Sequence, residues 1–217
     1  MKYFILGFSL FLAFTNHTLL SQSGSNENPE HGLWPRPEII PIPTKTKDVG
    51  DPVVWLNGKW FTNTSPGKEF WNEKIDSEDW KEIIVPSSIE KQGFNVRRGE
   101  EYAYKKSISI PQDFKNKRII LRFEGVTGTA KAWINGNFLK EHYGGFNGWT
   151  CDITDFVTPG QEALLTVGII DEERELSTSS FNHGGVIRSV KLMAVPQNHL
   201  TRFNVETDLD ENYENAE

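Results

Sequence analysis

Short runs in which apolar and polar residues alternate follow one another from Trp55 to the 188–195 segment. In the 118–124 segment, Ile119, Leu121 and Phe123 form an apolar face, and charged residues occupy most of the positions between them. This two-residue period is typical of a strand with one buried face. Because turn-forming residues separate the runs, the pattern predicts an all-β fold of about nine short strands in a two-sheet sandwich.

Two segments carry more specific signals within this pattern. Asn135-Gly136 lies between the apolar runs 130–134 and 137–139. A type I′ turn needs positive φ at both central residues, so this dipeptide predicts a tight hairpin. Residues 163–170 are apolar at both alternating sets of positions, which predicts a central strand buried on both faces. The only helix expected is a single turn over 153–157.

The N-terminal region indicates export rather than a folded element. Lys2 precedes an apolar run over residues 3–14, which is too short to span a bilayer and has the length of a signal-peptide core. We expect a signal peptide over residues 1–22, a secreted or periplasmic location, and no membrane contact after cleavage. Residues 23–52 contain six of the 11 prolines and no sustained apolar period, so we expect an extended linker there.

Composition narrows the range of partners. The chain has 23 Lys+Arg against 30 Asp+Glu, a formal net charge of −7, and no basic run. This balance argues against a nucleic-acid or anionic-membrane partner. The single cysteine, Cys151, excludes an intrachain disulfide and a Cys-based zinc site. A (β/α)₈ barrel needs about 250 residues, which is more than the 217 present.

The sequence patterns identify no catalytic residue, metal site or cofactor site. The five histidines include no pair at the spacings that metal ligation usually uses, and no G-x-S-x-G segment occurs. The acidic run 171–175 and the serine-rich segment 177–180 are explained equally well by solvated loops. Cys151 is expected to be a small packing residue in a strand over 149–152.

Eight short segments nevertheless occur in an informative order. They cover residues 56–61, 80–86, 104–111, 121–126, 132–136, 142–146, 152–155 and 184–192, and include Ala132-Trp133-Ile134-Asn135-Gly136. Together they resemble the N-terminal sugar-binding domain of family-2 glycoside hydrolases, which include β-galactosidases, β-glucuronidases and β-mannosidases. The resemblance implies a jelly-roll-like β-sandwich of the galactose-binding-domain-like class over residues 53–196. It also implies that residues 197–217 begin a truncated immunoglobulin-like domain.

The resemblance implies a carbohydrate partner but no catalytic residue in this chain. In the family, two glutamates in a barrel after the second domain act as acid/base and nucleophile. The expected function is therefore the carbohydrate-binding N-terminal domain of a secreted glycoside hydrolase, inactive alone. The alternatives are a free-standing carbohydrate-binding module and a protein-interaction sandwich without a sugar role.

Three sugar-binding candidates follow from the resemblance. Asp171 lies fourteen residues before Gly185, which matches the spacing of an aspartate in β-galactosidase-like members, and a strand-end cap is the competing role. Lys106 shares the apolar positions of its strand, but those relatives carry an asparagine near this position, which weakens a galactosidase specificity. Trp149, like Phe146, is a possible sugar-stacking aromatic whose simpler role is core packing.

Overall fold

The computed structural model describes residues 39–72, 75, 78–171, 184–205, 207, 209–212 and 214. The predicted signal peptide, most of the predicted linker and the 177–180 segment lie outside these residues. Glu172 to Glu175, the remainder of the acidic run after Asp171, also lie outside them.

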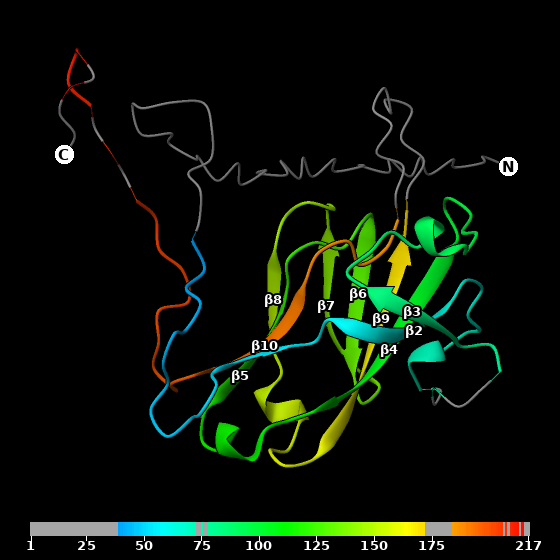
Figure 1. Cartoon of the computed structure of the whole chain (residues 1–217), viewed down its shortest axis with the longest axis horizontal. Coiled ribbons are helices and arrows are strands. Elements are labelled where there is room, and N and C mark those ends of the chain that lie inside the picture. Colours follow the sequence, from blue (N-terminus) through cyan, green and yellow to red (C-terminus); the bar gives the residue numbers. More distant parts are fainter. Residues whose placement is uncertain are drawn as a thin grey trace, which may run out of the picture. The chain divides into compact units, whose positions relative to one another are not determined.

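Ten strands form two antiparallel sheets among the described residues, one strand more than the pattern predicts (Figure 1). The four-stranded sheet has the order β1 (Val53–Trp55), β10 (Val190–Val195), β5 (Arg118–Phe123) and β8 (Trp149–Asp152). The six-stranded sheet has the order β3 (Lys81–Val85), β2 (Gly58–Asn63), β4 (Glu101–Ser109), β9 (Glu162–Ile170), β6 (Thr129–Ile134) and β7 (Asn137–Tyr143).

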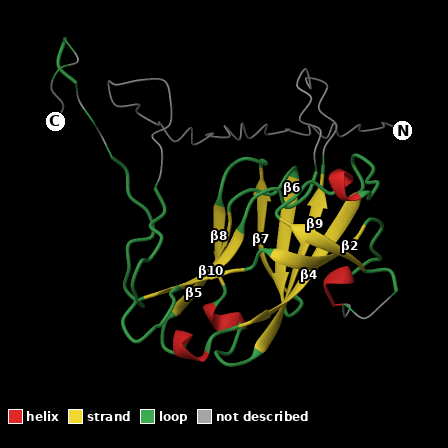
Figure 2. Ribbon diagram, in the orientation of Figure 1, coloured by secondary structure: helices red, strands yellow, loops and turns green. Residues whose placement is uncertain are grey.

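Helical structure is limited to single 3₁₀ turns in the connections between strands (Figure 2). They are η1 (Phe70–Asn72), η2 (Glu90–Gln92), η3 (Gln112–Phe114) and η4 (Thr154–Phe156). The last of them corresponds to the helical turn expected over 153–157. The prediction of an all-β sandwich with almost no helix is therefore confirmed.

Apolar side chains from both sheets meet in one core. Leu121 and Phe123 of β5, and Val167 and Ile169 of β9, are fully buried there. The alternation along β5 decides this placement, because every second residue points to the same side of a strand. Burying such side chains contributes roughly 1.5–3 kcal/mol each, so the sandwich is held mainly by contact between its sheets.

The strand-level predictions hold where the residues are described. β9 lies between β4 and β6, as expected of a strand that is apolar at both sets of positions. Asn135 and Gly136 connect β6 to β7 with φ of +49° and +79°, which is the backbone that a type I′ hairpin requires. Cys151 is buried in β8, which confirms its packing role.

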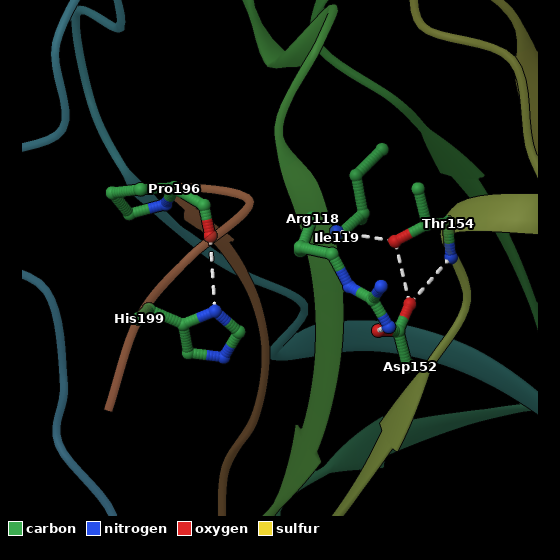
Figure 3. Close-up of polar contacts among 6 residues, drawn as sticks. All are labelled: Arg118, Ile119, Asp152, Thr154, Pro196 and His199. Carbon is green, nitrogen blue, oxygen red and sulfur yellow. Dashed lines mark hydrogen bonds and ion pairs between the residues drawn. The ribbon is translucent and has the colours of Figure 1, made fainter. Parts of the chain in front are cut away.

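The turn after β8 is fixed by a local polar cluster (Figure 3). The Thr154 backbone N–H and hydroxyl both donate to Oδ1 of Asp152, at 3.0 and 2.5 Å, and Arg118 forms an ion pair with the same carboxylate. Thr154 Oγ1 in turn accepts from the Ile119 N–H at 2.9 Å. These contacts join the β8–η4 turn to β5, and we assign them a structural role.

Candidate functional site

Asp171 lies at the end of β9, directly after the last strand residue, Ile170. Its neighbour on β4 is set by register, because Tyr102 pairs with Ile169. The Tyr102 hydroxyl donates to Oδ2 of Asp171 at 2.6 Å and lies 3.4 Å from Oγ1 of Thr127. Asp171 is thus held at the rim of the sandwich by a tyrosine that is itself buried in the core.

A second carboxylate, that of Glu90, faces the same region from η2. The Gly184 N–H donates to Oε1 and Oε2 of Glu90, at 3.0 and 3.1 Å, and the Ser88 hydroxyl donates to Oε2 at 2.9 Å. The Ile89 N–H donates to the Gly184 carbonyl at 3.0 Å. Hydrogen bonds therefore join the 87–90 segment to Gly184.

Gly184 is required by the space at this point. A Cβ there would overlap Oδ2 of Asp171 and would lie 2.7 Å from the Tyr102 hydroxyl. The next residue is held as well, since the Gly185 N–H donates to Oγ1 of Thr127 at 2.7 Å. Asp171, Tyr102, Thr127, Glu90 and Gly184 therefore form one connected group, which we call the Asp171 cluster.

Burial is the main influence on the Asp171 carboxyl, and it raises the pKa of this group. Hydrogen bonds from Tyr102 and Thr127 oppose the effect, and the charge of Glu90 reinforces it. A carboxylate that is partly desolvated and already oriented accepts hydrogen bonds more strongly than one in bulk water. The cluster is suited to accepting hydrogen bonds from hydroxyl groups.

Lys106 lies well away from this cluster. It pairs with Leu165 on β9, six residues before Asp171, a separation of about 20 Å along an extended strand. The Lys106 ammonium donates to the Lys59 carbonyl at 2.8 Å and lies 5.8 Å from the centre of the Trp60 ring. Burial lowers the pKa of Lys106. The structure does not bring Lys106 and Asp171 into one site.

Trp149 packs in the core. Only 3% of it is exposed, and its ring stacks on Phe123 at 4.2 Å and on His142 at 5.3 Å between centroids. A ring enclosed in this way has no free face for a sugar. Phe146 is 61% exposed, and the Arg188 guanidinium lies 5.8 Å from its ring centre.

Metal and membrane features are missing from the described part of the chain. No group of three or more His, Cys, Asp or Glu side chains is placed to hold a metal ion there. Across those same residues, no helix has the length and apolarity needed to cross a membrane.

Comparison with known families identifies the fold's relatives. Residues 53–196 match the family described as "Glycosyl hydrolases family 2, sugar binding domain". The chain belongs to glycoside hydrolase family 2. The resemblance inferred from the eight sequence segments is thereby confirmed.

Individual relatives in family 2 support this assignment. The chain is 27% identical over 192 residues to a β-galactosidase of Priestia megaterium, covering 75% of this chain and 19% of that enzyme. It is 28% identical over 161 residues to a putative β-glucuronidase of Formosa agariphila, covering 70% and 19%. The chain thus spans about a fifth of the length of these two relatives.

A solved structure shows the same fold. A β-glucuronidase from an uncultured Clostridium species superposes with a TM-score of 0.64 at 24% identity, covering 73% of this chain and 31% of that one. This similarity concerns the fold of the family-2 sugar-binding domain.

Sequence reasoning identifies Asp171 but misses the side chains that hold it. Tyr102 shares the inward positions of its strand with Tyr104, so the alternating pattern explains its burial without indicating a polar contact. Glu90 and Thr127 lie in connections between strands, where periodicity provides no signal. Their proximity to Asp171 depends on the pairing of distant segments.

Proposed function

We propose that this family-2 domain binds carbohydrate through the Asp171 cluster, as the N-terminal sugar-binding part of a glycoside hydrolase that cleaves O-glycosyl bonds. The observation that carries the proposal is the Asp171 carboxylate, fixed at the end of β9 by the 2.6 Å hydrogen bond from Tyr102. Charged acceptors of this kind contribute about 1.5–3 kcal/mol for each hydrogen bond, which is enough for recognition of a sugar hydroxyl.

The main alternative role for Asp171 is that of a structural cap. The Asp171 carbonyl accepts a 2.9 Å hydrogen bond from the Gly99 N–H, so the Asp171 backbone is already held to the segment that precedes β4. The side chain instead bonds the buried Tyr102 hydroxyl. This division of contacts favours a carboxylate held for a ligand, because the Asp171 backbone is anchored without the side chain.

Calorimetry tests this binding proposal. The 217-residue protein is titrated with oligosaccharides that contain galactose, glucuronate or mannose. We expect millimolar or tighter binding to one of them, and at least about tenfold weaker binding by Asp171→Ala, since one charged hydrogen bond is lost. Asp155→Ala is the matched control, because this exposed aspartate lies in η4, outside the cluster.

Two results would contradict the proposal. One is the absence of binding to all three sugars, which would favour a domain without a sugar role. The other is a lower melting temperature for Asp171→Ala with unchanged affinity, which would assign Asp171 to structure. Binding by the isolated protein would also fit a free-standing carbohydrate-binding module.

We further propose that this 217-residue chain does not cleave glycosides by itself. Retaining hydrolysis needs two carboxyl groups about 5 Å apart on either side of the bond, and the family resemblance assigns both to a barrel. Purified protein is therefore expected to release no p-nitrophenol from p-nitrophenyl β-galactoside, β-glucuronide or β-mannoside. Reproducible release that purifies with the protein would overturn this part.

Export is the last part of the proposed function. The charged and apolar pattern of residues 1–14 supports a signal peptide. Expression of the sequence with its leader should place the protein in the periplasm or medium, with an N-terminus near residue 22. Retention of uncleaved protein in the cytoplasm would argue against it.

A further inference from the structure

An exposed tryptophan lies on the outer face of the four-stranded sheet. Trp55 is the last residue of β1 and is 57% exposed. Val54 and Leu56, on either side of it, pack against the core, so the Trp55 side chain points outward from the sandwich.

Lys191 determines how the Trp55 ring lies. The two residues are paired across β1 and β10, and the Lys191 ammonium is 4.6 Å from the centre of the ring. The Lys191 side chain is only 4% exposed. One face of the indole therefore covers this cation against the sheet, and the solvent-exposed area is left to the other face.

Polar groups are arranged in a row beside this ring. Asn57, Ser189 and Glu124 occupy the next outward positions of the three adjacent chain segments. The Asn57 side-chain amide donates to Ser189 Oγ at 3.1 Å and accepts from the Val190 N–H at 3.2 Å. The Glu124 N–H donates to the Ser189 carbonyl at 2.9 Å. These contacts fix the row before any ligand is present.

The accessible charge in this row is negative. Lys191 Nζ and Arg122 Nε both donate to Oε1 of Glu124, at 2.7 and 2.9 Å. The two cations are largely covered, with 4% and 14% of their side chains exposed, whereas Glu124 keeps 28%. No hydrogen bond to Glu124 Oε2 occurs among the described residues, so this oxygen is an oriented acceptor.

We propose that Trp55, Asn57 and Glu124 form a saccharide-binding platform that takes one neutral pyranose unit of a polysaccharide. The C–H face of the pyranose stacks on the open face of the indole, and its hydroxyls donate to Glu124 and to the Asn57 amide oxygen. An apolar surface with a few fixed polar groups is the usual composition of a small-ligand site.

The chemistry of the platform selects its occupant. Because Glu124 Oε2 and the Asn57 amide oxygen are hydrogen-bond acceptors, the platform suits a neutral sugar that presents hydroxyl donors to them. Because the Trp55 side chain is 57% exposed at the end of β1, the ring can be reached by an internal unit of a polysaccharide as well as by a terminal one. The inference goes beyond the proposed function, since the Asp171 cluster is built on β9 and β4 of the other sheet.

Affinity electrophoresis of the 217-residue protein tests the platform. Native gels contain soluble galactomannan, mixed-linkage β-glucan or polygalacturonate, at about 0.15 M salt to screen the net charge of the protein. We expect retardation by a neutral polysaccharide and not by polygalacturonate. Trp55→Ala should weaken binding roughly tenfold, as for an aromatic residue central to a contact, and Trp55→Phe should retain part of it.

Two control variants locate the binding. Phe138→Ala removes another exposed aromatic, 54% exposed on the six-stranded sheet, and should bind like the unmodified protein. Asp171→Ala separates the two sites, because retardation that this variant keeps and Trp55→Ala loses belongs to the platform. Melting temperatures close to that of the unmodified protein are expected for the Trp55 variants, since the ring is largely outside the core.

Four outcomes would overturn the platform. They are no retardation by either neutral polysaccharide, equal retardation of Trp55→Ala and the unmodified protein, stronger retardation by polygalacturonate, and retardation that Asp171→Ala abolishes but Trp55→Ala does not. The last result would assign polysaccharide binding to the Asp171 cluster, so that the two proposals fail separately.

Discussion

The Tyr102 hydroxyl donates a 2.6 Å hydrogen bond to Oδ2 of Asp171, and this contact joins the core of the sandwich to its rim. Tyr102 is 1% exposed, so its ring has almost no freedom to move. The hydrogen bond from this buried side chain restricts the movement of the Asp171 carboxylate. The position of Asp171 therefore depends on β4 as much as on β9.

Tyr102→Phe tests this dependence. The substitution keeps the ring and removes the donor, leaving a partly desolvated carboxylate without one of its partners. We expect a loss of about 1.5–3 kcal/mol in the free energy of unfolding, measured by urea denaturation, together with weaker oligosaccharide binding. Tyr104→Phe is the matched control, because the Tyr104 hydroxyl donates to no acceptor among the described residues. Equal losses for both variants would contradict a special role for Tyr102.

Asp171→Asn tests the electrostatics of the same contact. Burial raises the pKa of Asp171 above its unfolded value, against the opposing hydrogen bonds of Tyr102 and Thr127. The folded chain therefore holds this proton more tightly than the unfolded chain, and its stability falls as pH rises from the unfolded pKa through the folded one. Asparagine does not ionise, so this variant should gain stability relative to the unmodified protein as pH rises above the unfolded pKa of about 4. Parallel stability curves would show that the carboxyl is not desolvated.

Gly184→Ala tests the close approach of the Gly184-Gly185 segment. The added Cβ would overlap the Asp171 carboxylate, so the segment or the carboxylate must shift. We expect a loss of about 1–3 kcal/mol in thermal or urea unfolding, and weaker sugar binding. At Gly50 a Cβ would meet only Oδ2 of Asp113, at 3.6 Å, so Gly50→Ala should be nearly neutral. A stable Gly184→Ala variant with full affinity would remove this segment from the site.

The fold was largely predictable because alternation and turn chemistry act locally. Ile119, Leu121 and Phe123 reach the core because neighbouring charged residues cannot, and Asn135-Gly136 adopts the backbone that few other dipeptides allow. The sequence does not show which strands pair, since β10 joins β1 and β5 across long stretches of chain. The contact between Trp55 and Lys191 therefore cannot be predicted from the alternating pattern, because it forms only when β1 pairs with β10.

The candidate site was predicted only in part, because the pairing of distant segments also decides which side chains surround Asp171. Asp171 is found through the spacing of a family motif, whereas Tyr102, Thr127 and Glu90 approach it from three other segments. Trp149 shows the converse case. By residue type its ring could serve a sugar contact or, more simply, the core, and its enclosure between Phe123 and His142 places it in the core.

Glu124→Gln tests the charge network beneath Trp55. Burial, the largest single influence, raises the pKa of Glu124, but the hydrogen bonds and charges of Lys191 and Arg122 together hold it below its usual value. The substitution leaves the buried Lys191 cation without its anion. We expect a loss of about 2 kcal/mol at pH 7, less than for a fully enclosed pair, because Glu124 remains partly exposed.

The pH dependence of this loss has a definite sign. A carboxyl with a lowered folded pKa contributes stability above its unfolded pKa of about 4.3, and that contribution disappears as pH falls through the folded value. The difference between Glu124→Gln and the unmodified protein should shrink in acid. Glu82→Gln is the control, since Glu82 pairs with Lys59 on the surface, with both side chains more than half exposed. A similar loss in both variants would contradict the network.

Cys151 provides a test of core integrity that needs no ligand. Its thiol is buried in β8, and burial raises its pKa to about 12, so about one thiol in 10⁴ is ionised at pH 8. Because the thiolate is the reactive form, we expect no measurable reaction with 5,5′-dithiobis(2-nitrobenzoate) while the protein is folded. One equivalent should react after unfolding in guanidinium chloride, because the sequence contains a single cysteine. The reaction rate at intermediate denaturant should therefore follow opening of the four-stranded sheet, and rapid reaction in buffer alone would show that β8 is not packed against the core.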